Sequence, residues 1–212
     1  MSDALIIFVR NPQLGKVKTR LAATLGEEKA LAIYQQLLAH TLVITKNCVA
    51  EKYVFYAGAL AEKDQWEQEG YKQLLQQEGD LGEKMHHAFE TVFSAGHQKV
   101  VIIGSDCIEL TEALIAEAFH GLDKNDAVIG PANDGGYYLL GLKQIYAPLF
   151  LNKPWSTDAV YAATIKDFEA VQLSFSVLPV LIDIDTEEDW NAAQKNSSHC
   201  SPFLSASVKI LF

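Results

Sequence analysis

The chain has 212 residues, of which 49% are hydrophobic and 21% are charged, as is typical of a soluble globular domain with a sizeable core. Its formal net charge of −10 argues against nucleic acid or an anionic membrane surface as a partner, because both are themselves negative. We expect no membrane span, which needs roughly 20 apolar residues, and no signal peptide, because the first apolar run, Leu5–Val9, is too short.

The three cysteines, Cys48, Cys107 and Cys200, are odd in number and widely spaced. Such spacing predicts neither a disulfide framework nor a zinc site. We therefore expect a protein of the reducing cytoplasm.

The first expected strand is Ala4–Val9, a short apolar run of the kind found in strands buried on both faces. A loop with Pro12 and Gly15 follows, and a helical segment begins at about Thr19. The loop region carries four cations, Arg10, Lys16, Lys18 and Arg20. Open α/β sheets bind ligands in such strand-to-helix loops, and a helix N-terminus there favours an anion. A solvated basic loop is the simpler alternative, but the clustering favours a site for a phosphorylated ligand.

Helical periodicity and strand-like runs alternate along the rest of the chain. The apolar face within Glu27–Lys46 fits a core or a homo-oligomer interface equally. The alternation of strand-like and helical segments predicts a mostly parallel sheet with helices on both faces. The expected helices are Glu27–Lys46, Glu83–Ser94, Thr111–Phe119 with Thr111 as N-cap, and Ser156–Phe168. The further expected strands are Tyr53–Ala57, Val100–Gly104, Ala127–Ile129, Tyr137–Leu142 and Val177–Ile184.

The loop from Gly130 to Gly141 joins two of these strands without room for a crossover helix. Because parallel neighbours need a crossover, we expect these strands to be antiparallel or to lie in different regions of the sheet. Asp134 precedes Gly135 and Gly136 in this loop, and glycines permit positive φ and close backbone approach. The loop is a plain hairpin or, as we favour, a ligand-facing segment.

An acidic residue, Asp106, follows the apolar run Val100–Gly104. This places it at the carboxyl edge of the sheet, the same edge as the basic loop. A carboxylate there can hold Mg²⁺, which takes oxygen ligands and shares them with substrate phosphates. The alternative is that Asp106 caps a helix or closes a turn.

A second acidic cluster lies late in the chain. Asp183 and Asp185 alternate at an expected strand end, so both would face the same side, and one of them could supply a second metal ligand. Thr186 and Asp189 instead fit a helix capping box. The domain is expected to span residues 1–195, and residues 196–212 are expected to form a C-terminal tail.

Another glycine, Gly82, lies at the start of an expected helix, where a nucleotide base or phosphate could approach it. An ordinary loop-to-helix junction explains it equally well. His86 and His87 on that helix have no further residue at metal-ligand spacing. A Gly-x-Ser-x-Gly elbow, a Walker A motif and a Gly-x-Gly-x-x-Gly motif are all absent from the sequence, which argues against hydrolase, P-loop and dinucleotide-binding classes.

Taken together, these motifs resemble the nucleotide-diphospho-sugar transferase superfamily, whose members share the GT-A fold. The chain is most similar to the GT-A-like group called transferase 1 (radical-SAM/selenodomain-associated), formerly a domain of unknown function. The resemblance implies a single-domain α/β GT-A fold with a Rossmann-like, mostly parallel mixed sheet. The matching motifs, in the family's order, are Pro12–Leu21, Gly79–Met85, Gly104–Cys107, Gly130–Tyr137, Pro154–Thr157 and Asp183–Asp189.

The resemblance also implies roles for individual residues. Asp106 would hold Mg²⁺ or Mn²⁺. Beyond the resemblance, we expect Asp185 as the second metal ligand and Asp134 as a candidate base for an acceptor hydroxyl. The cations that would neutralise the leaving phosphates are Arg10, Lys18 and Arg20. The positions that would bind the nucleotide, sugar or acceptor are Gly15, Gly82, Lys84, Gly135, Gly136, Tyr137, Trp155, Ser156 and Thr157.

The implied activity is Mg²⁺-dependent transfer from a nucleotide diphosphate-sugar to a small-molecule acceptor. One alternative is a nucleotidylyltransferase that joins an NTP to a phosphorylated acceptor and releases pyrophosphate. It is suggested because Gly104–Cys107 provides one Asp where glycosyltransferases of this fold carry Asp-x-Asp. An alternative of another class is a catalytically silent nucleotide-binding module that serves a partner enzyme.

Overall fold

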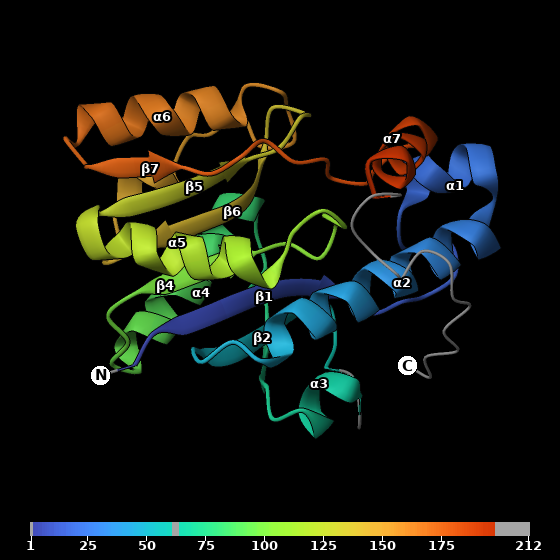
Figure 1. Cartoon of the computed structure of the whole chain (residues 1–212), viewed down its shortest axis with the longest axis horizontal. Coiled ribbons are helices and arrows are strands. Elements are labelled where there is room, and N and C mark those ends of the chain that lie inside the picture. Colours follow the sequence, from blue (N-terminus) through green and yellow to red (C-terminus); the bar gives the residue numbers. More distant parts are fainter. Residues whose placement is uncertain (1, 61–63, 198–212) are drawn as a thin grey trace.

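One seven-stranded sheet organises the fold, and its strands run in the order β3-β2-β1-β4-β6-β5-β7 (Figure 1). The structure is a computed structural model that describes residues 2–60 and 64–197. The strands are β1 (Ala4–Arg10), β2 (Glu51–Ala57), β3 (Lys72–Leu75), β4 (Val100–Ile103), β5 (Ala127–Pro131), β6 (Tyr137–Leu142) and β7 (Phe175–Val177). The helices are α1 (Thr19–Leu25), α2 (Glu27–Lys46), α3 (Gln65–Gln68), α4 (Leu81–Ser94), α5 (Glu112–Lys124), the 3₁₀ helix η1 (Ala147–Leu149), α6 (Val160–Ala170) and α7 (Glu187–Ser197).

The sheet is mixed, with a parallel majority. β1 pairs in parallel with β2 and β4, β2 with β3, and β5 with β7. β6 is antiparallel to both β4 and β5. The prediction of an antiparallel pair around the Gly130–Gly141 loop is confirmed, as is the mostly parallel α/β sheet.

Helices cover both faces of the sheet, as predicted. Side chains alternate along β1, so that Leu5 and Ile7 join one buried apolar cluster and Ala4 and Ile6 join the other. Helices α1, α2, α3, α5 and α7 contribute to the first cluster, and α4 and α6 contribute to the second. Burial on both faces explains why β1 is uninterrupted apolar sequence. None of the helices in the described ranges has the length and apolar character needed to cross a membrane.

The predicted strand Val177–Ile184 is wrong over most of its length. β7 ends at Val177, and the chain runs on without regular ladder pairing. Leu178 N donates to the carbonyl of Ile129 and Leu181 N to that of Pro131, so the donors are three residues apart where a regular ladder has them two apart. Single backbone hydrogen bonds and one bridge, at Leu181, still keep this segment beside β5.

Two helices have ends that differ from the prediction. α4 begins at Leu81, earlier than predicted, because Asp80 and Glu83 form a capping box. α5 has the predicted N-cap, Thr111, but continues to Lys124. The predicted α2 boundaries are confirmed.

Two further differences lie near the C-terminal half. α6 begins at Val160, and Ser156, its predicted first residue, has a φ of 63°, a left-handed conformation that a right-handed helix does not contain. α7 includes residues 196 and 197, which were predicted to belong to the tail. The rest of that tail, including Cys200, lies outside the described residues.

The strand order reverses between β1 and β4. From β1 the chain proceeds to β2 on one side, and from β4 it proceeds to β5 on the other side. Open α/β sheets bind ligands in the crevice outside the carboxyl ends of two such strands. The basic loop follows β1 and Asp106 follows β4, so the two predicted features meet at this point. In Figure 1, α7 (red) lies beside α1 (blue) at the same end of the sheet.

Candidate functional site

A cleft of about 670 Å³ lies at the carboxyl ends of β1 and β4, a volume suited to a small ligand. Its walls come from the basic loop, the start of α4, the start of β6 and the segments before α6 and α7. The cations that line it are Arg10, Lys16, Lys18, Arg20 and Lys84. The acids that line it are Asp80, Asp106, Asp183 and Asp185.

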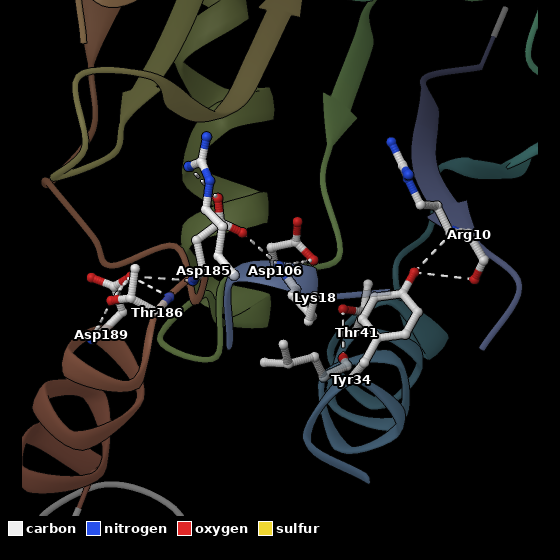
Figure 2. A network of polar contacts seen from close by, with 10 residues as sticks. Arg10, Lys18, Tyr34, Thr41, Asp106, Asp185, Thr186 and Asp189 are labelled. Atoms are coloured by element: carbon white, nitrogen blue, oxygen red, sulfur yellow. Dashed lines mark hydrogen bonds and ion pairs between the residues drawn. The ribbon is translucent and has the colours of Figure 1, made fainter. Parts of the chain in front are cut away.

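Lys18 is the centre of the charged wall (Figure 2). Its Nζ lies 2.9 Å from Oδ1 of Asp106 and 3.0 Å from Oδ1 of Asp185. The Lys18 side chain is only 5% exposed. Burial by itself would lower the pKa of its ammonium, but attraction to Asp106 and Asp185 outweighs burial and the pKa lies above the ordinary value. Lys18 is therefore a buried, charged ammonium at neutral pH.

The backbone aims Lys18 into the sheet edge. Lys18 is the N-cap of α1 and has φ 48° and ψ 48°, in the left-handed region. Such a conformation is costly for a residue with a Cβ and tends to persist at sites where other contacts demand it. At Lys18, the contacts that accompany this left-handed conformation are the ion pairs with Asp106 and Asp185.

Asp185 is positioned by the start of α7. Oδ2 of Asp189 accepts from the backbone N–H groups of Asp185 (3.2 Å) and Thr186 (2.8 Å), and Oγ1 of Thr186 accepts from Asp189 N (3.2 Å) (Figure 2). The predicted capping box is thus confirmed. In addition, Ile184 N donates to the carbonyl of Asp106 at 2.9 Å. The two aspartates are therefore tied to each other through their backbones.

Two arginines flank the charged wall. The hydroxyl of Tyr34, on α2, accepts from Arg10 N at 2.9 Å and donates to Arg10 O at 3.1 Å, which fixes the end of β1 (Figure 2). Arg20 Nη1 lies 3.6 Å from Oδ2 of Asp185, but its side chain is 72% exposed. An exposed pair of this kind contributes little by itself, so the Arg20 guanidinium can turn to a bound anion.

Asp183 lies deeper in the same wall. Burial, together with the charges of Asp106 and Asp134, raises the pKa of its carboxyl to about 7. Asp183 thus lines the cleft together with Asp106 and Asp185, although the strand on which we expected Asp183 and Asp185 to alternate is not formed. In the described part of the chain, no group of three or more His, Cys, Asp or Glu side chains is arranged to hold a metal ion. The ion pairs single out Asp106 and Asp185 as the carboxylates that share a cation.

We predict that Asp183→Asn stabilises the metal-free protein, and more so at about pH 8 than at about pH 5. A carboxyl with a raised folded-state pKa makes the native state bind the proton more tightly, so the free energy of unfolding falls as pH rises. The free energy of unfolding decreases between the ordinary pKa of 3.8 and the raised pKa of about 7. An uncharged amide at position 183 abolishes this decrease. Thermal unfolding in EDTA measures the effect, with exposed Asp158→Asn as control. Equal stabilisation at both pH values would contradict the account.

Comparisons with known proteins identify the family. The family model described as "Uncharacterized protein conserved in bacteria (DUF2064)" matches residues 40–157. The chain belongs to the DUF2064 family. No curated protein matches the chain.

Solved structures place this DUF2064 member in a larger superfamily. A protein of Desulfovibrio desulfuricans, described as a candidate nucleotide-diphospho-sugar transferase, is 32% identical with a TM-score of 0.87; the match covers 98% of this chain and 92% of that one. The chain therefore has the GT-A-like fold of the nucleotide-diphospho-sugar transferase superfamily. The relative that shares this fold at 32% identity is described as a transferase, consistent with the chain being an enzyme.

Two more distant structures share the fold alone. A cytidylyltransferase of Leptospira borgpetersenii is 13% identical with a TM-score of 0.61, and the match covers 96% of this chain and 89% of that one. The Rv0371c protein of Mycobacterium tuberculosis, in complex with manganese, is 12% identical with a TM-score of 0.57; the match covers 92% and 99%.

The remaining residues predicted for the DUF2064 site fall into two groups. Those that line the cleft are Lys84, Tyr137, Trp155 and Ser156. Those outside the cleft lining are Gly15, Gly82, Asp134, Gly135, Gly136 and Thr157. Glycines of the second group permit close packing behind the residues that line the cleft. For example, a Cβ on Gly135 would lie 2.1 Å from the carbonyl of Asp158, so this glycine lets the hairpin loop pack against the segment before α6.

Gly82 has a similar packing role beneath Trp155. A Cβ at Gly82 would lie 2.2 Å from the carbonyl oxygen of Phe150 and 2.6 Å from Nε1 of Trp155. We predict that Gly82→Ala lowers the free energy of unfolding by about 1–3 kcal/mol, the usual cost of overpacking. Urea denaturation followed by circular dichroism measures the change. Gly104→Ala, where an added Cβ meets nothing within 4 Å, is the control, and an unchanged midpoint for Gly82→Ala would contradict this packing role.

Several residues that line the cleft were not predicted as site residues, and Gln76, Tyr34 and Ser105 are polar examples. Gln76 follows β3, a short strand that sequence patterns did not reveal, and its Nε2 donates to the carbonyl of Phe55 at 3.0 Å. Tyr34 looks like one more apolar-face residue of α2, and Ser105 looks like part of a turn. Nothing in the local sequence distinguishes these two from ordinary core and loop residues.

Proposed function

We propose that this protein is a divalent-metal-dependent transferase that binds a nucleotide diphosphate-sugar in the cleft and transfers from it to a small-molecule acceptor. One observation carries the proposal: the basic loop after β1 converges with Asp106 and Asp185 where the strand order reverses. The likeness to the Desulfovibrio desulfuricans protein, described as a candidate nucleotide-diphospho-sugar transferase, supports the same class.

The carboxylates of Asp106 and Asp185 fit a divalent cation. Their Oδ1 atoms already share one cationic group, the Lys18 ammonium, and their side chains are 41% and 45% exposed toward a ligand. Mg²⁺ commonly takes one or two protein carboxylates and completes its shell with phosphate oxygens and water. Mn²⁺ accepts similar oxygen ligands. When bound, such a cation supplies Lewis-acid stabilisation of charge on phosphate oxygens.

The cations of the basic loop would hold the diphosphate. Arg10, Lys18 and Arg20 line one side of the cleft, where fixed positive charge stabilises negative charge that develops on the leaving group. Gly15 would let the loop approach the phosphates closely. At the start of α4, Lys84 would lie near the nucleoside, above Gly82.

The opposite wall would receive the sugar and the acceptor. Tyr137, Trp155 and Ser156 line it, backed by Gly135, Gly136 and Thr157 in the segments behind them. Asp134 is our candidate for the base that takes the proton of the acceptor hydroxyl. Its Oδ1 accepts from Gly136 N at 2.9 Å, which orients the carboxylate. Its negative charge contributes to the raised pKa of Asp183.

A nucleotidylyltransferase reaction is the second candidate. It is favoured by the origin of the carboxylate pair, because Asp106 follows β4 and Asp185 precedes α7, in place of a single Asp-x-Asp. In that reaction the same cations would stabilise pyrophosphate as the leaving group, and the acceptor would carry a phosphate.

Product analysis tests the two candidates. The protein is incubated with nucleotide diphosphate-sugars or NTPs, with Mg²⁺ or Mn²⁺ and a panel of hydroxyl and phosphorylated acceptors. Release of NDP from a sugar nucleotide supports the first candidate, and release of pyrophosphate from an NTP supports the second. Nucleotide binding without release of either would overturn both and indicate a binding module that serves a partner enzyme.

A further inference from the structure

The Lys18 ammonium lies where a divalent cation shared by Asp106 and Asp185 would lie. Its Nζ is 2.9 and 3.0 Å from one oxygen of each carboxylate. Mg²⁺ binds oxygens at about 2.0–2.1 Å, so an ion on the same two oxygens would lie close to the ammonium, and repulsion between the two positive charges disfavours holding both there. Occupation of the carboxylate pair is therefore a choice between Lys18 and the metal.

In the metal-free protein, the Lys18 ammonium depends on Asp106 and Asp185 as its anionic partners. Its side chain is 5% exposed, and its backbone is held in the left-handed region at the start of α1. An ammonium that leaves the two aspartates must find another anion, because a buried charge without a partner is strongly unfavourable. Arg20 is a poor substitute at the carboxylates, since it is 72% exposed and lies 3.6 Å from Asp185.

We propose that Lys18 is a resident counter-ion: it keeps Asp106 and Asp185 together in the metal-free protein and moves to the nucleotide phosphates when a divalent cation takes the carboxylates. The inference rests on the proposed function, because it takes these aspartates as the metal-binding pair. It has one thermodynamic consequence. Phosphates receive the displaced ammonium, so metal and nucleotide each tighten the binding of the other by the same factor.

The test is Mn²⁺ binding to the whole chain without nucleotide, measured from the electron paramagnetic resonance signal of free Mn²⁺. We expect Lys18→Met to bind Mn²⁺ at least roughly tenfold more tightly than the wild type, because the competing ammonium is gone. Lys16→Met is the matched control: Lys16 is exposed in the same loop and lines the same cleft, so it removes the same charge without touching the aspartates. Tightening in Lys18→Met no greater than in Lys16→Met would overturn the proposal.

Lys18→Gln is a second variant in case Lys18→Met does not fold. If neither folds, the wild type decides, with ADP, CDP, GDP and UDP as probes and a correction for Mn²⁺ bound to free nucleotide. Mn²⁺ affinity that no nucleotide raises would overturn the counter-ion role. The proposed function fails separately: if wild type and variants bind no Mn²⁺ with or without these nucleotides, the metal site itself is wrong.

Discussion

Asp106→Asn is expected to remove metal-dependent transfer while leaving the fold intact. The substitution keeps the shape of the side chain but deletes the charge that a divalent cation requires. The Asp106 side chain is 41% exposed at the edge of the sheet, so the core does not depend on it. Loss of a residue that only supports a metal ligand lowers metal affinity or activity by about 10–100-fold. Asp106 is proposed as a ligand itself, so we expect kcat/KM to fall by at least roughly 100-fold. Steady-state kinetics with the active nucleotide measure the loss.

The control for this prediction is Asp123→Asn on α5, a half-exposed aspartate that pairs with Lys99 and is absent from the cleft lining. It should keep activity and Mn²⁺ affinity. Circular dichroism should show both variants folded. If Asp106→Asn retained wild-type Mn²⁺ affinity and turnover, Asp106 would have no place in the metal site.

Replacing Arg10 and Arg20 together by Met is expected to weaken nucleotide binding by roughly 30-fold or more. Charge-assisted hydrogen bonds are each worth about 1.5–3 kcal/mol, and solvent exposure of these side chains reduces that value. Unlike Lys18, neither arginine is committed to a buried ion pair. The double variant therefore removes positive charge from the cleft and the exposed Arg20–Asp185 contact, but leaves the ion pairs of Lys18 with the aspartates in place. Isothermal titration calorimetry with nucleotide and Mg²⁺ gives the two dissociation constants.

A double variant of equal charge change, Lys124→Met with Lys166→Met, is the control. Both lysines are exposed, on α5 and α6, and neither lines the cleft. This control variant should lose less than about threefold in nucleotide affinity. Nucleotide binding by the Arg10 and Arg20 variant should also depend less on salt concentration than binding by the wild type. Equal affinities in the two double variants would move the phosphate site elsewhere.

The sheet and the edge that carries the candidate site could be predicted because local patterns specify them. β1 is buried on both faces, and only an uninterrupted apolar run suits such a strand. The basic loop and Asp106 each follow such a run, so the placement of both at one edge follows from parallel pairing. The capping box of Thr186 and Asp189 is likewise a spacing of a few residues.

The details that depend on distant contacts could not be predicted. Lys18 pairs with Asp185, 167 positions away, through a left-handed backbone that no local pattern demands. Gly82 serves the packing of Trp155 and Phe150, which only the folded chain brings together. The strand ends at Val177, where the next donors to β5, Leu178 and Leu181, lose the two-residue spacing of a ladder.

The most direct test of the central claim is a thermal-shift screen of NTPs and nucleotide diphosphate-sugars, each with and without Mg²⁺. A ligand that binds the native state raises its unfolding temperature. The account predicts a shift with at least one nucleotide that is larger with Mg²⁺ than with EDTA. The absence of a shift with every nucleotide, or a shift that Mg²⁺ does not increase, would contradict a metal-assisted phosphate site in this cleft.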